Sequence, residues 1–176
     1  NKNLIIKETF GRAIKNHQEG KIDIAQELYN QVLKIDPTHS QSLSNIAVIF
    51  ANLKEYQKAK DCYEKAIKIN PNYLDAHNNL GVLLKELGEH QKAKDCYEKA
   101  IEIDPNYVDA YYNLGLIFKE LGEPQKAKDC YEKAIKINPN YADAYNNLGN
   151  VFKDSGNLQK AKDCYVKAIE INPNYV

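Results

Sequence analysis

The sequence predicts an all-α solenoid made of five helix-turn-helix repeats, each 34 residues long. The main observation is that the chain superposes on itself after a shift of 34 positions, which aligns Asn79-Leu80-Gly81, Asn113-Leu114-Gly115 and Asn147-Leu148-Gly149. Two further observations are a helical spacing of apolar residues and a glycine and a proline that recur at fixed places. We expect a lead-in of residues 1–5 and a single array over residues 6–176, with repeats at 6–39, 40–73, 74–107, 108–141 and 142–175.

The first half of each repeat is predicted to be a helix. In the repeat 108–141, the positions i, i+3, i+4 and i+7 of one buried helical stripe are occupied by Tyr111, Leu114, Gly115 and Phe118. This helix is expected to end at a glycine, because the residue after a helix often adopts the left-handed conformation that glycine tolerates. The glycines are Gly20, Gly88, Gly122 and Gly156, and the repeat 40–73 has Lys54 in their place.

An Asn-x-x-Asp pattern stands at the start of three first helices and resembles a capping box. The pairs are Asn72 with Asp75, Asn106 with Asp109, and Asn140 with Asp143. The aspartate would also lie near the positive end of the helix dipole, where a negative charge is stabilising.

The second half of each repeat is predicted to be a second helix. In the repeat 108–141, Pro124 is expected to open it, because the first helical position needs no N–H donor. Its face towards the first helix would carry Ala127, Tyr131 and Ala134, and Gly115 is expected to lie opposite these alanines so that the helices approach closely. A proline, which cannot continue the hydrogen-bond ladder, ends each second helix, at Pro37, Pro71, Pro105, Pro139 and Pro173.

Composition and charge argue against several classes of function. The 176 residues carry a formal net charge of zero with both signs interspersed, so neither nucleic acid nor an anionic membrane is expected as a partner. The longest apolar runs, such as Val82-Leu83-Leu84, are too short to span a bilayer, and no signal peptide is visible. Methionine is absent, even at position 1, so we expect a fragment of a longer protein.

Four cysteines stand 34 residues apart, at Cys62, Cys96, Cys130 and Cys164. Equivalent positions in stacked helix pairs lie roughly 10 Å or more apart, whereas a disulfide needs Cα atoms within about 7 Å. A zinc site draws its ligands even closer together. We therefore expect half-buried packing residues, with no metal and no cofactor, and free thiols favour a cytoplasmic location.

No enzyme is predicted. The four histidines occupy four different positions of the repeat, and the sequence has no zinc-protease helix, phosphate loop, nucleophile elbow or dinucleotide fingerprint. On the second helices, lysines alternate with acidic residues in the pattern Lys58, Lys60, Asp61, Glu64 and Lys65 and in its later copies. A solvated outer face with salt bridges explains this pattern better than a nucleic-acid surface.

The repeat resembles a known family. Leu114-Gly115, then Ala127-x-x-x-Tyr131-x-x-Ala134, then Pro139, at a period of 34, is similar to the tetratricopeptide repeat. The resemblance covers all but the first few residues and is weaker in the repeat 6–39. It implies a right-handed superhelical solenoid in which the first helices line the concave side.

The first helices carry the candidate binding residues. One asparagine per repeat forms a column, at Asn45, Asn79, Asn113 and Asn147. Each amide offers two donors and an acceptor, which suits the backbone of an extended peptide. Around the column we place Asn78, Tyr112, Asn146 and Asn150, with Asp109 near one edge and Lys85 and Lys119 near the other.

Two interpretations of this column stay open. The resemblance implies a column similar to the one that lines the superhelix of O-linked N-acetylglucosamine transferase, where it holds the backbones of substrate peptides. In the alternative, asparagine is a consensus residue of the family that bonds within its own repeat. A carboxylate clamp for chaperone C-termini is unlike this face, because aspartates and asparagines stand where such a clamp needs lysine and arginine.

Three functions follow as hypotheses. The first is a scaffold whose concave face binds a peptide or protein segment, with Tyr112 and the asparagine column as hot spots. The second is a substrate-presenting arm of a larger enzyme such as a glycosyltransferase. The third is self-assembly into a homo-oligomer through an uncapped C-terminal repeat, where Val166 replaces the glutamate found at Glu64, Glu98 and Glu132.

Overall fold

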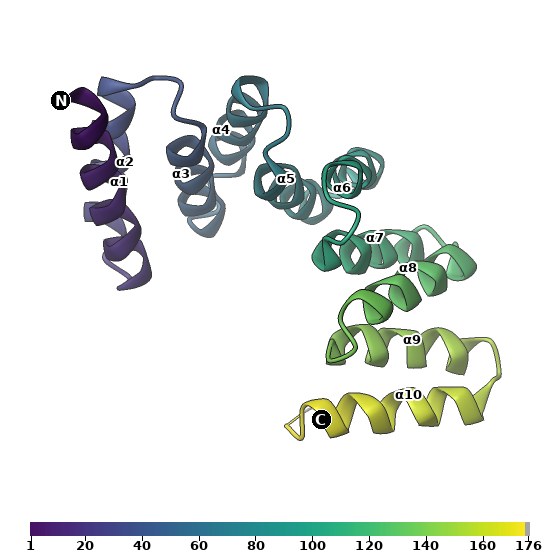
Figure 1. Ribbon diagram of the computed structural model, residues 1–176. Coiled ribbons are helices and arrows are strands. Elements are labelled where there is room, and N and C mark those ends of the chain that lie inside the picture. The colour runs from purple at the N-terminus through teal and green to yellow at the C-terminus, as the bar shows by residue number, and fades with distance from the viewer. Residues whose placement is uncertain (175–176) are drawn as a thin grey trace. The chain divides into compact units, whose positions relative to one another are not determined.

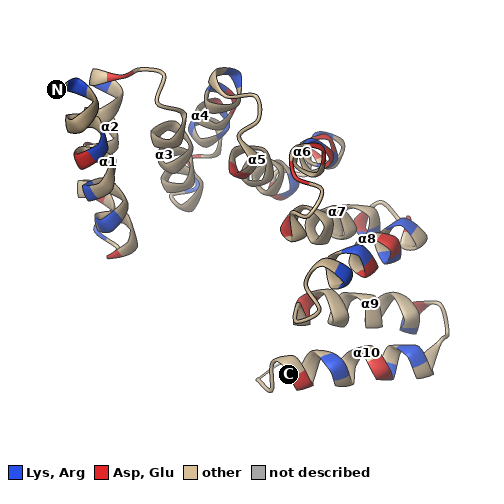
Figure 2. Cartoon of the chain, viewed as in Figure 1, with Lys and Arg blue, Asp and Glu red and all other residues tan. Residues whose placement is uncertain are grey.

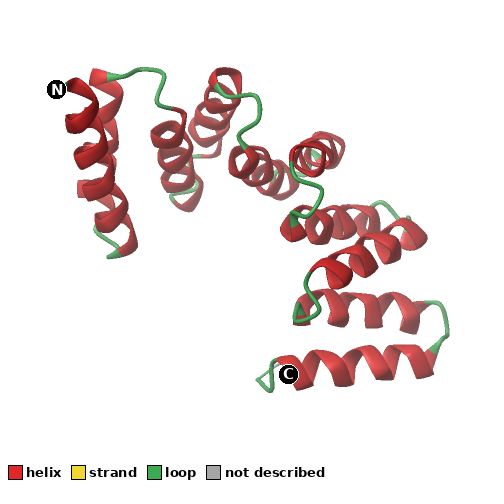
Figure 3. Cartoon of the chain, viewed as in Figure 1, coloured by secondary structure: helices red, strands yellow, loops and turns green. Residues whose placement is uncertain are grey.

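The computed structural model describes residues 1–174, and Tyr175 and Val176, which end the predicted array, lie outside the described residues. It contains ten helices joined by short loops (Figures 1 and 3), which confirms the all-α fold class and the five helix pairs. The chain divides into two compact units, residues 1–83 and residues 84–176, each of which is described by itself. The boundary between them lies inside a helix, α5 (Leu74–Glu86).

Unit 1 contains α1 (Lys2–Gln18), α2 (Ile22–Ile35), α3 (Ser40–Asn52), α4 (Tyr56–Ile69) and most of α5. Unit 2 contains the end of α5, α6 (His90–Ile103), α7 (Val108–Glu120), α8 (Pro124–Ile137), α9 (Ala142–Asp154) and α10 (Leu158–Ile171). The two helices of a repeat pack along each other, as α7 does with α8, and neighbouring repeats meet through a second helix and the next first helix, as α8 does with α9. Because α1 begins at Lys2, the predicted lead-in is helical.

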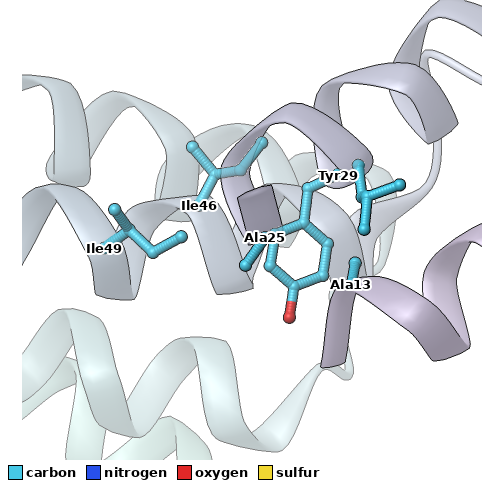
Figure 4. Close-up of a cluster of buried hydrophobic side chains, with 6 residues drawn as sticks. Ala13, Ala25, Tyr29, Ile46 and Ile49 are labelled. Atoms are coloured by element: carbon cyan, nitrogen blue, oxygen red, sulfur yellow. The ribbon is translucent and has the colours of Figure 1, made fainter. Parts of the chain in front are cut away.

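The core of unit 1 shows how the repeat packs. Figure 4 shows the ring of Tyr29 beside Ala13 and Ala25, the small residues that let α1 and α2 approach each other. Ile46 and Ile49 of α3 close the same buried cluster. Cys62 packs against this cluster, and all four cysteines are half-buried, which confirms their predicted packing role.

In unit 2 the small residue of the first helix faces a ring. A Cβ atom added to Gly115 would lie 2.5 Å from Cε1 of Tyr131, and one added to Gly149 would lie 2.6 Å from Cε1 of Tyr165. The prediction that Gly115 lies opposite the alanines of the second helix was therefore incomplete. The glycine makes room for the tyrosine ring, while Ala127 and Ala134 are fully buried beside that ring.

The first helices end as predicted. Gly122 has φ of +71°, its N–H donates to the carbonyl of Lys119, and the N–H of Glu123 donates to the carbonyl of Phe118. This is the left-handed helix end that satisfies the last carbonyls. Lys54 takes the same conformation with φ of +60°, so this lysine adopts a backbone conformation that suits glycine.

The predicted capping boxes were wrong. α7 and α9 have Tyr107 and Tyr141 as N-caps, with no hydrogen bond from the capping side chain. The N–H of Asn140 instead donates to the side-chain oxygen of Asn138 at 3.0 Å, across the intervening proline, and Asn106 does the same towards Asp104 at 2.9 Å. These asparagines belong to the turn that ends one repeat, since Asp and Asn side chains readily accept from the backbone N–H two residues later.

The second helices have a charged, solvated face. Figure 2 shows basic and acidic bands alternating along α8 and α10. Lys128 pairs with Glu132 at 3.7 Å and Lys94 pairs with Glu98 at 3.5 Å, which confirms the salt bridges predicted for this face. Among the described residues, no helix is long and apolar enough to cross a membrane.

Candidate functional site

Unit 2 brings five side chains together on the first helices, and we call them the Tyr112 cluster: Asp109, Tyr112, Tyr141, Asp143 and Asn147. Asp109 and Tyr112 are three residues apart on α7, and Asp143 and Asn147 are four apart on α9, so each pair shares one face of its helix. Tyr141 is the N-cap of α9 and so stands at the start of that helix.

Hydrogen bonds and ring contacts fix the geometry of the cluster. The rings of Tyr112 and Tyr141 lie 5.0 Å apart between centroids, at 43° to each other. The Tyr141 hydroxyl donates to Oδ1 of Asp109 at 3.3 Å. The Asn147 amide nitrogen donates to the Tyr112 hydroxyl at 3.2 Å and to the carbonyl of Asp143 at 3.1 Å. Tyr112 on α7 is therefore held by a residue of α9, and Tyr141 at the start of α9 is held by a residue of α7.

The electrostatic environment of the cluster is negative. Burial, followed by the charge of Asp109, raises the pKa of Tyr141, and Asp143 adds to the shift. Burial and then Asp143 also raise the pKa of Tyr112. Both phenols are neutral at physiological pH, and the carboxylates beside them supply the local charge.

A buried hydroxyl without a partner adjoins the cluster. The Tyr131 ring lies 6.1 Å from that of Tyr112, its side chain is fully buried, and its hydroxyl has no hydrogen-bond partner. The equivalent hydroxyl of Tyr165 donates to Asn150 at 2.8 Å. Where Asn150 stands in the last repeat, the repeat of Tyr131 has Leu116, which cannot accept a hydrogen bond.

Unit 1 has a related site around Tyr29. The Asn45 amide donates to the Tyr29 hydroxyl at 3.2 Å, and Nδ1 of His17 lies 3.3 Å from the same oxygen. A cavity of about 360 Å³ opens there, lined by these three residues together with Ile14 and Gln18. Phe10 occupies the position of Tyr112, so the column asparagine of unit 1 bonds a second-helix tyrosine, whereas Asn147 bonds a first-helix one.

The other predicted site residues are placed as follows. All four column asparagines are half-buried, as are Asn146, Asn150 and Lys85, whereas Lys119 and Asp109 are exposed. Asn78 is buried, with 7% of its surface exposed, so less of it is open to solvent than of the other predicted residues. Asn45, Asn78 and Asn79 belong to unit 1 and the other predicted residues to unit 2.

Sequence reasoning found Tyr112 but missed the other tyrosines of the two sites. Tyr29 and Tyr141 were given no role, and Tyr131 was placed only on the face of the second helix that packs against the first. The signal that could have found them is that both positions carry tyrosine in other repeats as well, as in Tyr107 and Tyr165. A phenol that recurs next to a column of amides can donate a hydrogen bond to a neighbouring amide or accept one from it. Within residues 1–174, no group of three or more His, Cys, Asp or Glu side chains could hold a metal ion.

Comparison with known proteins identifies the family. Models of the tetratricopeptide repeat match residues 40–73, 74–107, 108–141 and 142–175, and a second such model matches residues 16–39. No curated protein matches the chain. Among solved structures, MamA is 30% identical, with 92% of this chain and 94% of that chain covered and a TM-score of 0.81.

Two further solved structures share the fold at lower identity. PilF of Pseudomonas aeruginosa is 21% identical, with 97% of this chain and 78% of that chain covered and a TM-score of 0.91. YrrB, described as a tetratricopeptide repeat protein with an unusual peptide-binding site, is 23% identical, with 95% and 86% covered and a TM-score of 0.75. The period, the helix pairs and the family models agree. The chain belongs to the tetratricopeptide repeat family.

Proposed function

We propose that this chain is a protein-binding scaffold whose first helices bind an extended segment of another protein. The observation that carries the proposal is the half-buried state of the column asparagines Asn45, Asn79, Asn113 and Asn147. The amides of Asn45 and Asn147 are held by hydrogen bonds, and all four remain partly open to solvent, which is what the recognition of a peptide backbone needs. The family is one of interaction scaffolds, and YrrB offers a neighbour whose description names a peptide-binding site.

The hydrogen bonds of Asn147 sharpen the proposal. Both hydrogens of its amide are used, by the Tyr112 hydroxyl and the Asp143 carbonyl. The side-chain oxygen is therefore the atom that a ligand can address, and it accepts hydrogen bonds only. The bond to the Asp143 carbonyl lies within one repeat, as the structural interpretation expects. Both bonds also orient the oxygen before a ligand arrives, which reduces the entropy lost on binding.

A peptide library tests this function. A random library of extended peptides is bound to the chain and to the triple variant Asn79→Ala, Asn113→Ala, Asn147→Ala. We expect the triple variant to bind at least about tenfold more weakly, since each lost hydrogen bond is worth about 1 kcal/mol. N-methylation of the best peptides should weaken binding as well, because it removes the N–H donors that the asparagine oxygens would accept.

Asn30→Ala provides the matched control, since Asn30 is exposed on the second helix α2. Helicity by circular dichroism should be the same in all variants. Equal binding by the triple variant and the parent chain would leave the asparagines as structural residues and end the proposal. The absence of enzymatic activity, a cytoplasmic location and the presentation of the segment to the catalytic domain of a larger enzyme stay predictions.

A second candidate function, self-association, is favoured by an apolar surface on α10. Leu158, Val166 and Ile169 are 69%, 47% and 49% exposed. Glu132, the residue equivalent to Val166 in the preceding repeat, is also exposed, so this position is apolar only in the last repeat. We propose that a second copy of the chain covers this surface, because burying it there removes apolar area from water.

Sedimentation velocity at rising concentration tests this assembly. The parent chain should sediment faster as concentration rises, whereas Val166→Glu should remain monomeric because it restores the charge of the other repeats. Leu121→Glu, at an exposed leucine elsewhere in unit 2, is the control and should behave like the parent. A parent chain that stays monomeric at high concentration contradicts the assembly.

A further inference from the structure

We propose that the Tyr112 cluster binds a positively charged side chain of the bound segment, with arginine preferred over lysine. This inference rests on the proposed function, since the side chain belongs to a segment that lies on the first helices. It adds the chemical class of one ligand residue and the place where that residue binds.

Charge is the first argument. Asp109 is exposed and its carboxylate lies 3.3 Å from the Tyr141 hydroxyl, while Asp143 acts on the same phenol from α9. Lys119 stands ten residues after Asp109 on α7, which places it roughly 15 Å further along the helix at 1.5 Å per residue. The cluster is therefore a negative site at one end of the first helices, and its complement is a cation.

Ring geometry is the second argument. Tyr112 and Tyr141 are both half-buried, and their rings are tilted by 43° at a centroid distance of 5.0 Å. A guanidinium group stacks on such a ring face and can pair with a carboxylate through two parallel hydrogen bonds, which an ammonium group cannot do. Because both hydroxyls are already engaged, by Asp109 and Asn147, the rings do not need to reorient to receive it.

The unpartnered hydroxyl of Tyr131 offers a ligand an acceptor beside Tyr112, a state that it shares with the buried hydroxyl of Tyr97 in the preceding repeat. The equivalent hydroxyls of Tyr29 and Tyr165 are bonded by Asn45 and Asn150, which both lie on first helices. The Tyr131 hydroxyl therefore points to the same face, where nothing within the described residues satisfies it. A buried polar group left unpaired costs free energy, which a ligand group beside Tyr112 would recover by donating to this oxygen.

The cluster exists once in the chain. The position of Tyr112 is occupied in the other repeats by Phe10, Ser44, Asn78 and Asn146. Only the repeat 108–141 thus combines the recurring aspartate and turn tyrosine with a phenol on the first helix. The site would fix where along the column a charged residue of the segment is placed.

The test compares two peptides of nearly the same shape, of which one carries a charged side chain and the other a neutral one. One is a fluorescein-labelled Gly-Ser-Ala-Arg-Ala-Ser-Gly peptide, and the other carries citrulline, the neutral isostere of arginine, in its place. Fluorescence anisotropy with the parent chain should show at least about tenfold tighter binding of the arginine peptide. Asp109→Asn and Tyr112→Leu should each reduce this preference to below about threefold, and the preference should weaken with added salt.

Asp129→Asn is the matched control. It removes an exposed carboxylate from the second helix α8, where Asp129 accepts a hydrogen bond from Gln125 at 2.8 Å, and it should keep the full preference for arginine. Equal binding of the two peptides by the parent chain would overturn the charged site while leaving the scaffold function intact. Failure of the parent chain to bind either peptide would also overturn the charged site, while the scaffold function stays with the library experiment.

Discussion

Lys54 is the residue at which the chain departs most clearly from its own repeat. It holds φ of +60° where Gly20, Gly88, Gly122 and Gly156 hold +71° to +79°. A non-glycine residue in this conformation costs about 1–2 kcal/mol. Lys54→Gly should therefore raise the free energy of unfolding by about 0.5–1 kcal/mol, after allowance for the larger unfolded-state entropy of glycine.

Urea unfolding measures this effect. The reciprocal change, Gly122→Lys, should lower the free energy of unfolding by a similar amount, because a Cβ atom there meets open space and only the backbone conformation is strained. A destabilised Lys54→Gly variant would show that the lysine side chain contributes more than its backbone conformation costs.

The hydroxyls of Tyr131 and Tyr165 should respond oppositely to removal. The Tyr131 hydroxyl is buried and unpartnered, so Tyr131→Phe should leave the stability of the free chain unchanged or raise it by about 1 kcal/mol. The Tyr165 hydroxyl donates to Asn150, so Tyr165→Phe should cost about 0.5–1.5 kcal/mol. Thermal unfolding of both variants decides the matter, and a greater loss in Tyr131→Phe would mean that its hydroxyl has a partner in solution.

At the scale of the helix pair, the effect of one added methyl group on stability depends on whether the glycine that receives it packs against a ring. Gly115→Ala places a Cβ atom 2.5 Å from the Tyr131 ring and should cost about 1–2 kcal/mol, even though alanine favours the helix. Gly11→Ala is the matched control, since nothing lies within 4 Å of its added Cβ atom in α1.

Urea unfolding of the two variants gives the comparison. Gly11→Ala should stabilise the chain by about 0.5–1 kcal/mol through helix propensity alone. If Gly115→Ala stabilised it equally, the Tyr131 ring could move aside freely. Close packing of the ring between α7 and α8 would then be excluded.

Helix pairs were predictable because their signals are local and repeated. The stripe of Leu114 and Phe118, the left-handed stop at Gly122 and the terminating Pro139 each depend on neighbours within a few residues, and the structure confirms them. The Asn106 and Asn140 caps failed because the helices start one residue later, with Tyr107 and Tyr141 as N-caps, and the backbone N–H of each asparagine donates to the Asx side chain two residues before it. Sequence spacing does not distinguish these partners.

The candidate site was predictable only in outline. The column of asparagines follows from the period, but the bonding partner of each amide depends on whether its neighbour is Phe10 or Tyr112. Likewise, Tyr131 and Tyr165 read identically in their own helices, and the difference between them comes from Leu116 and Asn150 on the facing helix. Which hydrogen bond forms therefore depends on the side chains that the neighbouring helices bring within reach, and the sequence of one helix does not show this.

For the whole chain, stability should behave as a sum over repeats. Deletion of residues 108–141 removes one helix pair and joins residue 107 to residue 142, which keeps the flanking repeats in register. Circular dichroism should then show the remaining helicity, with a lower unfolding temperature. Complete loss of the helical signal after this deletion would contradict the repeat architecture.

Alkaline pH should destabilise the whole chain. Burial raises the pKa of the Cys130 thiol from 9.0 to about 12, and burial also raises the pKa of Cys62, Cys164 and several tyrosines. A group whose folded pKa is raised stabilises the fold fully below its unfolded pKa and loses that contribution as pH rises through the folded value. The free energy of unfolding should therefore fall between about pH 9 and pH 12.

Unfolding midpoints across this range check the prediction. Cys130→Ala should lose stability less steeply with pH than the parent chain, because it removes one of the groups that titrate. A stability that stays constant up to pH 12 would show that the thiols and phenols reach water without unfolding.

The repetition of the asparagine column limits how a ligand can be aligned. Within unit 2, Asn113 and Asn147 recur unchanged on neighbouring first helices and offer a polypeptide backbone two registers of equal energy, a multiplicity that tightens apparent binding by at most a factor of two, or about 0.4 kcal/mol. Such a surface can hold a segment without deciding which of its residues faces which repeat. The single phenol of Tyr112 breaks this degeneracy, because only one register places the charged residue of the segment beside it.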